Sequence, residues 1–236
     1  MIVKNDLFDY ENRYIYQDSN GFKFSVDSIL LAEYANFAFD DKNVLDLCTG
    51  NASVPLIMST YNKSHYVGFE IQKDVYDLGV LSINYNKLDK QIMIYNDDVN
   101  NISKYFKKGY FDIITCNPPF FKVNDVKVVN SNEKKALARH EITFHLEDAF
   151  KIASQYLNDK GILYIVQRAN RLDELFLLAV KYNLHIKKLS LVSTKKEEKP
   201  SIVLVKCLKN SKMGVVIDSQ ICIDNLKSYK HLFKEN

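Results

Sequence analysis

The chain has few cysteines, and their spacing does not suggest a metal site. The four cysteines, Cys48, Cys116, Cys207 and Cys222, are far apart and include no Cys-x-x-Cys pair. This spacing argues against a zinc site and gives no basis for a disulfide framework. We therefore expect no bound metal.

Long apolar runs are also absent. No apolar stretch reaches the roughly 20 residues that cross a bilayer. The first residues, 1–6, are not followed by the apolar core of a signal peptide. We therefore expect a cytoplasmic protein that does not bind membranes.

Neither sign of charge is in large excess. The net charge is +3 over 236 residues, so charge alone does not indicate a nucleic-acid partner. Lysines nevertheless cluster in segments 104–108, 122–135 and 187–199, where they can contact phosphates. A lysine-rich, solvated surface explains the same clusters, and both interpretations stay open.

What the chain does contain is an alternating pattern typical of an α/β domain. Hydrophobic residues make up 47% and charged residues 26%, which is ordinary for a globular protein of this size. From residue 43 onward, short apolar runs alternate with helical patterns. The expected strands are 43–48, 65–70, 91–96, 111–116, 161–167, 185–192 and 201–208, and the expected helices are 52–61, 72–86, 102–106, 146–157 and 172–182.

This alternation predicts a mostly parallel seven-stranded sheet with helices on both faces. The last two strands follow each other closely, which predicts an antiparallel edge. We interpret residues 1–42 as an N-terminal lid or extension, with a helix that Asp27 can cap, and 43–236 as the main domain. In such sheets ligands bind beyond the carboxyl ends of the strands.

Three expected strand ends carry residues suited to a nucleoside cofactor. Asp46, Cys48 and Gly50 form a turn after the first strand, where small residues let the backbone approach a ligand. Glu70 ends the second strand and can accept hydrogen bonds from ribose hydroxyls. Asp98 follows the third strand and can accept one from an adenine amine. Each of these sites also has a plainer explanation. The segment with Asp46, Cys48 and Gly50 can be an ordinary turn, Glu70 a surface charge and Asp98 a helix N-cap.

Residues 44–52 resemble the first motif of Rossmann-like methyltransferases, and the cofactor implied is S-adenosylmethionine. The usual motif, D-x-G-x-G-x-G, has three glycines, of which only Gly50 is present here. Cys48 and Ala52 occupy the other two positions. A dinucleotide is disfavoured because no glycine-rich, phosphate-binding loop remains.

The strongest local signal is Asn117-Pro118-Pro119-Phe120, directly after an apolar strand. An exocyclic base amine is a poor nucleophile, because its lone pair is delocalised into the ring. The Asn117 side-chain oxygen and the Pro118 carbonyl can accept its two hydrogens, and consecutive prolines add no competing N–H. Phe120 can stack on the base. This pattern predicts transfer of a methyl group to such an amine, with catalysis mainly by positioning.

Cys116 precedes this loop and raises the alternative of a cysteine nucleophile, as in base C5 methylation. It follows Thr115 rather than a proline and lies within the expected strand. We therefore interpret Cys116 as a small packing residue.

The order of these motifs resembles the N6-adenine methyltransferases, and more narrowly the bacterial enzymes that methylate N6 of adenosine 37 in a valine tRNA. The resemblance rests also on segments 24–28 (FSVDS) and 138–141 (ARHE). It implies a tRNA partner, with no obligate protein partner. The residues implied or expected to bind cofactor are Asp46, Gly50, Glu70, Asp98 and Asn117, the first residue of the Asn-Pro-Pro-Phe loop. Those implied or expected to contact the tRNA are Phe121, Lys127, Lys134, Lys135, Arg139 and His140.

Other functions share the same tetrapeptide. They include guanine-N2 methylation of rRNA and glutamine methylation of a protein, although the latter usually has tyrosine where this chain has Phe120. A non-catalytic RNA-binding module with a methyltransferase fold is a further alternative. The presence of Asn117 disfavours it, because an inactive protein does not need this residue.

Overall fold

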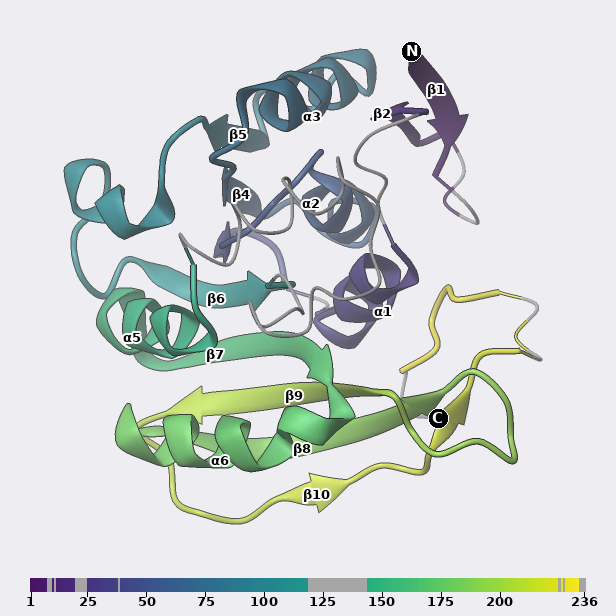
Figure 1. The fold of residues 1–236 in the computed structure, drawn as a ribbon. Coiled ribbons are helices and arrows are strands. Elements are labelled where there is room, and N and C mark those ends of the chain that lie inside the picture. Colours follow the sequence, from purple (N-terminus) through teal and green to yellow (C-terminus); the bar gives the residue numbers. More distant parts are fainter. Residues whose placement is uncertain are drawn as a thin grey trace.

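The computed structural model describes residues 1–7, 10, 12–19, 25–37, 39–118, 144–224, 226 and 228–233. Within these residues a large sheet crosses the molecule (Figure 1). Its strands are β3 (Asn43–Asp46), β4 (His65–Phe69), β5 (Ile92–Tyr95), β6 (Phe111–Cys116), β7 (Leu157–Arg168), β8 (Leu184–Ser193), β9 (Ile202–Lys209), β10 (Val216–Ile217) and β11 (Ile221–Cys222).

The strand order along the sheet is β5-β4-β3-β6-β7-β9-β8-β10, and β11 also pairs with β8. β9 runs antiparallel to both of its neighbours, and the other pairs are parallel. The seven expected strands and the antiparallel pairing near one edge are therefore confirmed. The two-residue strands β10 and β11 were not expected, since each is too short to produce a sequence pattern.

Helices cover both faces of this sheet, as expected. One apolar core lies between the sheet and helices α5 and α6. A second core lies on the other face, beneath α1, α2 and α3. The helices are α1 (Val26–Tyr34), α2 (Ser53–Met58), α3 (Lys73–Tyr85), α5 (Leu146–Tyr156) and α6 (Leu172–Lys181), with 3-10 turns η1 (Val99–Lys104) and η3 (Ala169–Arg171).

The chain order of the parallel strands reverses between β3 and β6. From β3 the chain continues to β4 and β5 on one side, whereas β6 and β7 lie on the other. Asp46 at the end of β3 pairs in register with Thr115 near the end of β6. This reversal places a ligand-binding crevice at the carboxyl ends of the strands, which we call the carboxyl edge.

The N-terminal residues pack against the main domain in two places. β1 (Ile2–Asp6) and β2 (Tyr14–Asp18) form an antiparallel hairpin that the sequence analysis did not predict. The hairpin contacts α3, where Tyr16 N donates to Ser82 Oγ at 2.9 Å. Helix α1 packs against α2 and β7. Its N-cap is Ser25, so the prediction that Asp27 caps this helix is wrong: Asp27 lies one residue inside the first turn.

The described residues contain neither a membrane-spanning helix nor a cluster of metal-binding side chains. None of the helices in this part of the chain is long and apolar enough to cross a membrane. Nor do its histidines, cysteines, aspartates and glutamates gather in a group that could hold a metal ion.

Candidate active site

The loop after β3 turns sharply at the centre of the carboxyl edge. Asp46 is 2% exposed and accepts a hydrogen bond on Oδ1 from Thr115 Oγ1 at 2.7 Å. Gly50 has φ +58° and Ala52 has φ +67°, so both adopt the left-handed conformation. A left-handed alanine costs about 1 kcal/mol. The loop thus keeps the turn of the methyltransferase motif at a position where glycine has been replaced.

Burial dominates the electrostatics of Asp46. It raises the pKa of this carboxyl to about 6, and the hydrogen bond from Thr115 opposes the rise. The second oxygen, Oδ2, is buried and has no hydrogen-bond partner. An unpaired buried acceptor is costly, and the amino group of a bound ligand is the kind of donor that would satisfy it.

Glu70 follows β4 and clamps the same loop. It is 3% exposed, and its carboxylate accepts hydrogen bonds from Gly50 N at 3.1 Å and Gln72 N at 2.8 Å. Burial raises the pKa of Glu70 to about 7, while these two backbone N–H groups favour the charged form. A carboxylate has about four lone-pair sites, so it can still accept bonds from ligand hydroxyls.

Two aspartates follow β5. Asp98 is the N-cap of η1 and accepts bonds from Asn100 N at 2.9 Å and Asn100 Nδ2 at 3.0 Å. Asp98 therefore does cap a helix, which was its plainer explanation. Contact between Asp98 and the adenine amine of a cofactor stays a prediction. Asp97 accepts bonds from Asn101 and Tyr105, and these bonds lower the pKa of Asp97.

These strand ends surround one pocket. It contains about 300 Å³ of empty space including its open mouth. Three of the expected cofactor residues, Cys48, Glu70 and Asp98, line this pocket, whereas Asp46, Gly50 and Asn117 are not among its lining residues. The lining residues are Leu47, Cys48, Phe69, Glu70, Ile71, Asp97, Asp98, Val99 and Phe144.

The chemistry of this lining fits S-adenosylmethionine. Three carboxyl groups give the pocket a negative character suited to a ligand with a sulfonium and an ammonium group. The apolar side chains offer flat walls for an adenine ring. Phe144 was missed by the sequence analysis, because it lies after a long polar stretch and belongs to no motif.

The thiols of Cys48 and Cys116 lie next to each other. The contact with the Cys116 thiol raises the pKa of Cys48 well above its ordinary value, and burial raises it further. Cys116 is fully buried in the core beneath α5 and α6. A cysteine buried among apolar side chains behaves as a structural residue, in agreement with the packing role expected for Cys116.

Asn117 leaves β6 at the carboxyl edge, half-buried, and Pro118 after it is buried. The Asn117 side-chain Nδ2 donates to Ser28 Oγ in α1 at 3.0 Å. The sequence analysis quoted Ser28 within the FSVDS segment but gave it no role. The other residues expected to act here lie outside the described residues: Pro119, Phe120, Phe121, Lys127, Lys134, Lys135, Arg139 and His140.

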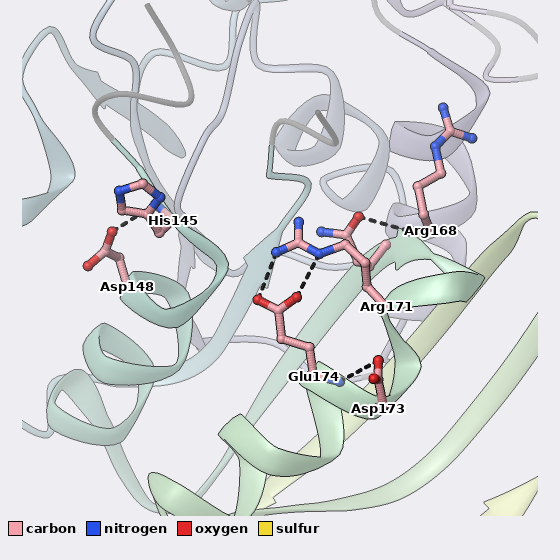
Figure 2. Close-up of polar contacts among 7 residues, drawn as sticks. His145, Asp148, Arg168, Arg171, Asp173 and Glu174 are labelled. Carbon is pink, nitrogen blue, oxygen red and sulfur yellow. Dashed lines mark hydrogen bonds and ion pairs between the residues drawn. The ribbon is translucent and has the colours of Figure 1, made fainter. Parts of the chain in front are cut away.

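The neighbouring end of β7 carries arginines that the sequence analysis did not single out. Figure 2 shows Arg171 in a bidentate ion pair with Glu174, at 2.8 and 2.9 Å, and Arg168 extending away from that pair. Arg168 lowers the pKa of Asp27 in α1, although burial raises it more. No sequence motif marks these residues, since their position depends on the pairing of β6 with β7.

The family described as conserved hypothetical protein 95 matches residues 27–164, more than half of the chain. The match covers α1 from Asp27 onward and every strand end described above except the end of β7. It thus includes Ser28, the loop after β3 and the Asn-Pro-Pro-Phe tetrapeptide.

Curated relatives match over nearly the full length. A tRNA1(Val) (adenine(37)-N6)-methyltransferase from Phocaeicola vulgatus is 22% identical over 99% of this chain and 94% of its own length. A protein of the same name from Porphyromonas gingivalis is 25% identical over 86% of this chain and 80% of its own.

Solved structures share the fold at lower identity. A predicted O-methyltransferase from Agrobacterium tumefaciens aligns with a TM-score of 0.66 and 16% identity, over 86% of this chain and 90% of that one. A tRNA m1G37 methyltransferase from M. jannaschii aligns with a TM-score of 0.60 and 14% identity, over 85% of this chain and 55% of that one. The fold is therefore that of Rossmann-like methyltransferases.

Proposed function

The chain belongs to the conserved hypothetical protein 95 family, and from this premise we propose that it transfers a methyl group from S-adenosylmethionine to N6 of adenosine 37 in a valine tRNA. The observation that carries the proposal is Asn117-Pro118 at the end of β6, at the reversal of strand order beside a carboxylate-lined pocket. The names of the full-length relatives support the choice of substrate.

In this proposal, Glu70 holds the ribose hydroxyls and Asp98 the adenine amine of the cofactor. Asp46 Oδ2 and the loop at Gly50 face its methionine part. When bound, S-adenosylmethionine supplies an electrophilic methyl group on a sulfonium centre. Cys48 contributes a small side chain at the pocket wall, where the methyltransferase motif usually has glycine.

Asn117 acts on the other reactant. Its Oδ1 and the Pro118 carbonyl accept the two hydrogens of the adenine amine, which lets the nitrogen become tetrahedral and frees its lone pair. The nitrogen then forms a bond to the methyl carbon as the carbon–sulfur bond breaks. The nitrogen becomes cationic and acidic, and it loses its proton to solvent, so no strong base is required. Phe120 stacks on the base and holds it in place.

The decisive experiment supplies labelled S-adenosylmethionine with an unmodified valine tRNA transcript. We expect one methyl group on adenosine 37, found as N6-methyladenosine by mass spectrometry of nuclease fragments. A transcript with guanosine at this position serves as the control and should accept none. Methylation of rRNA guanine or of a release-factor glutamine, with the tRNA left unmodified, would refute the proposal.

We also propose that lysines directly after the catalytic loop grip the tRNA phosphates. Lys127, Lys134 and Lys135 lie outside the described residues, and the support for them is that they belong to the segment that follows the Asn-Pro-Pro-Phe loop in the chain. Replacing all three with alanine should weaken tRNA binding and reduce its salt dependence by about 0.7–0.9 in slope per lost contact.

The matched control for the lysines is the pair Lys107→Ala and Lys108→Ala. These exposed lysines precede the amino end of β6, on the opposite side of the sheet from the catalytic loop. If tRNA binding by the triple variant and by the wild type has the same salt dependence, other residues bind the tRNA phosphates.

A further inference from the structure

The first turn of α1 lies against the carboxyl ends of β6 and β7. Ser28 Oγ accepts a hydrogen bond from Asn117 Nδ2 at 3.0 Å, across 89 positions of sequence. One residue earlier, Asp27 lies close enough to Arg168 at the end of β7 for the guanidinium to lower its pKa. Helix α1 therefore lies against the end of β6, from which the candidate catalytic loop begins, and against the end of the neighbouring strand β7.

The Ser28 hydroxyl is firmly placed. Ser28 is 6% exposed, and the residues that follow it in α1, 29–34, are all buried. The backbone N–H of Ser28 donates to Ser25 O at 3.1 Å, which closes the first turn. Because this turn is fixed in a packed helix, its hydroxyl is a rigid partner rather than a mobile surface group.

The contact determines which end of the Asn117 amide is available to a substrate. A primary amide carries an acceptor oxygen and a donor nitrogen on the same carbon. With Nδ2 bound to Ser28, Oδ1 points away from α1. An exocyclic amine presents N–H groups, so an acceptor attracts it and an N–H donor repels it.

We propose that Ser28 is a positioning residue for the methyl transfer: it holds the Asn117 amide with its oxygen toward the target amine. This inference rests on the proposed function, in which Asn117 Oδ1 accepts a hydrogen of that amine. Ser28 itself touches no reactant. It acts through Asn117, so the position of α1 affects the rate of methyl transfer.

Removing the hydroxyl tests this role. Ser28→Ala should lower kcat about tenfold, the upper range for one lost hydrogen bond. The KM for tRNA and the affinity for S-adenosylhomocysteine should stay within about twofold. Ser28→Thr keeps the hydroxyl and should restore kcat to within about threefold of wild type. An unchanged kcat in Ser28→Ala would overturn the proposal.

A double-mutant cycle separates positioning from general damage. In an Asn117→Ala background no amide remains to be oriented, so adding Ser28→Ala should cause no further loss of single-turnover rate. An equal tenfold loss in both backgrounds would assign Ser28 a merely structural role. Ser59→Ala is the matched control, because Ser59 is a buried serine bound to its own helix at Leu56 O, 2.8 Å away.

A second readout requires no substrate. In ¹⁵N-labelled protein, the signals absent from the Asn117→Ala spectrum identify the Asn117 side-chain amide. Ser28→Ala should shift these signals, and Ser59→Ala should not. Unshifted signals in Ser28→Ala would overturn the contact even if the true substrate is another amine. If the wild type methylates such an amine, the proposed substrate is wrong, and the cycle is measured on that amine instead.

Discussion

Two halves of the carboxyl edge hold their polar side chains in different ways. In the cofactor half, at the ends of β3 to β5, backbone amides bind two of the carboxylates: Gly50, from the loop after β3, and Gln72 bind Glu70, and Asn100 binds Asp98. In the catalytic half, at the ends of β6 and β7, Asn117 is bound by the side chain of Ser28. The backbone contacts of the first half span at most 20 positions of sequence, whereas the Asn117 contact spans 89 and depends on the docking of α1.

The two halves also differ in their response to protons. Burial raises the pKa of Asp46 to about 6 and of Glu70 to about 7. Asn117 and Ser28 do not titrate. We therefore expect pH to affect cofactor binding more than the orientation of Asn117. We also expect substitutions in the cofactor half to lower cofactor affinity, and substitutions in the catalytic half to lower kcat.

The largest effect is expected in the catalytic half. Asn117→Ala should lower kcat by about 10²–10³, as for the loss of one oriented polar group in an active site. The affinity for S-adenosylhomocysteine should hardly change. Single-turnover kinetics and calorimetry measure the two quantities. Asn158→Ala is the control, since that half-buried amide binds Asp112, near the amino end of β6. High residual activity in Asn117→Ala would remove the distinction between the halves.

The corresponding change in the cofactor half is Glu70→Ala. It removes hydrogen bonds to the ribose worth roughly 1–3 kcal/mol, so affinity for S-adenosylhomocysteine should fall about 10- to 100-fold. At saturating cofactor, kcat should fall much less. The exposed carboxylate of Asp74 in α3 provides the control variant, Asp74→Ala. If calorimetry gives the same affinity for Glu70→Ala and wild type, Glu70 does not contact the cofactor.

A pH series should give a smaller effect. The pKa of Glu70 is about 7 in the ligand-free protein. Ribose hydroxyls that donate to the carboxylate favour its ionised form, so cofactor binding lowers this pKa. Below pH 7 the protonated Glu70 must therefore lose its proton when the cofactor binds. Affinity should therefore rise as pH increases through 7, by up to about tenfold between pH 6 and pH 8. In Glu70→Ala this rise should largely disappear. Affinity that falls over this range would contradict the assigned sign.

The smallest effect is expected for Cys116→Ala. The thiol is fully buried and packs in the core, so activity should stay within about threefold of wild type, with a loss of stability of order 1 kcal/mol. Circular dichroism and the methyl-transfer assay together decide this. A variant that folds but is inactive would indicate nucleophilic catalysis and would undermine the role given to Asn117.

The outcome of the sequence analysis follows the same division. Strand β6 was expected with the observed ends because a buried parallel strand is a continuous apolar run. The hairpin of β1 and β2 was missed, since β1 is almost entirely exposed and shows no alternation of apolar and polar residues. Asp98 matched two patterns at once, and the structure shows its N-cap role. A sequence pattern reveals a helix or strand when burial of one face gives its apolar residues a regular spacing. It fails for an element that is stabilised only by contacts with neighbouring elements.

The sequence by itself determined the α/β architecture, the strand ends that carry Asp46, Glu70 and Asn117, and the type of chemistry that an Asn-Pro-Pro-Phe loop supports. Each of these depends on residues within one βα unit, so spacing along the chain is enough. Only the tertiary structure decided that Cys48 and Cys116 lie next to each other and that Phe144 lines the cofactor pocket. It also decided which end of the Asn117 amide Ser28 binds. Those contacts join distant segments, and packing against a common sheet is what brings them together.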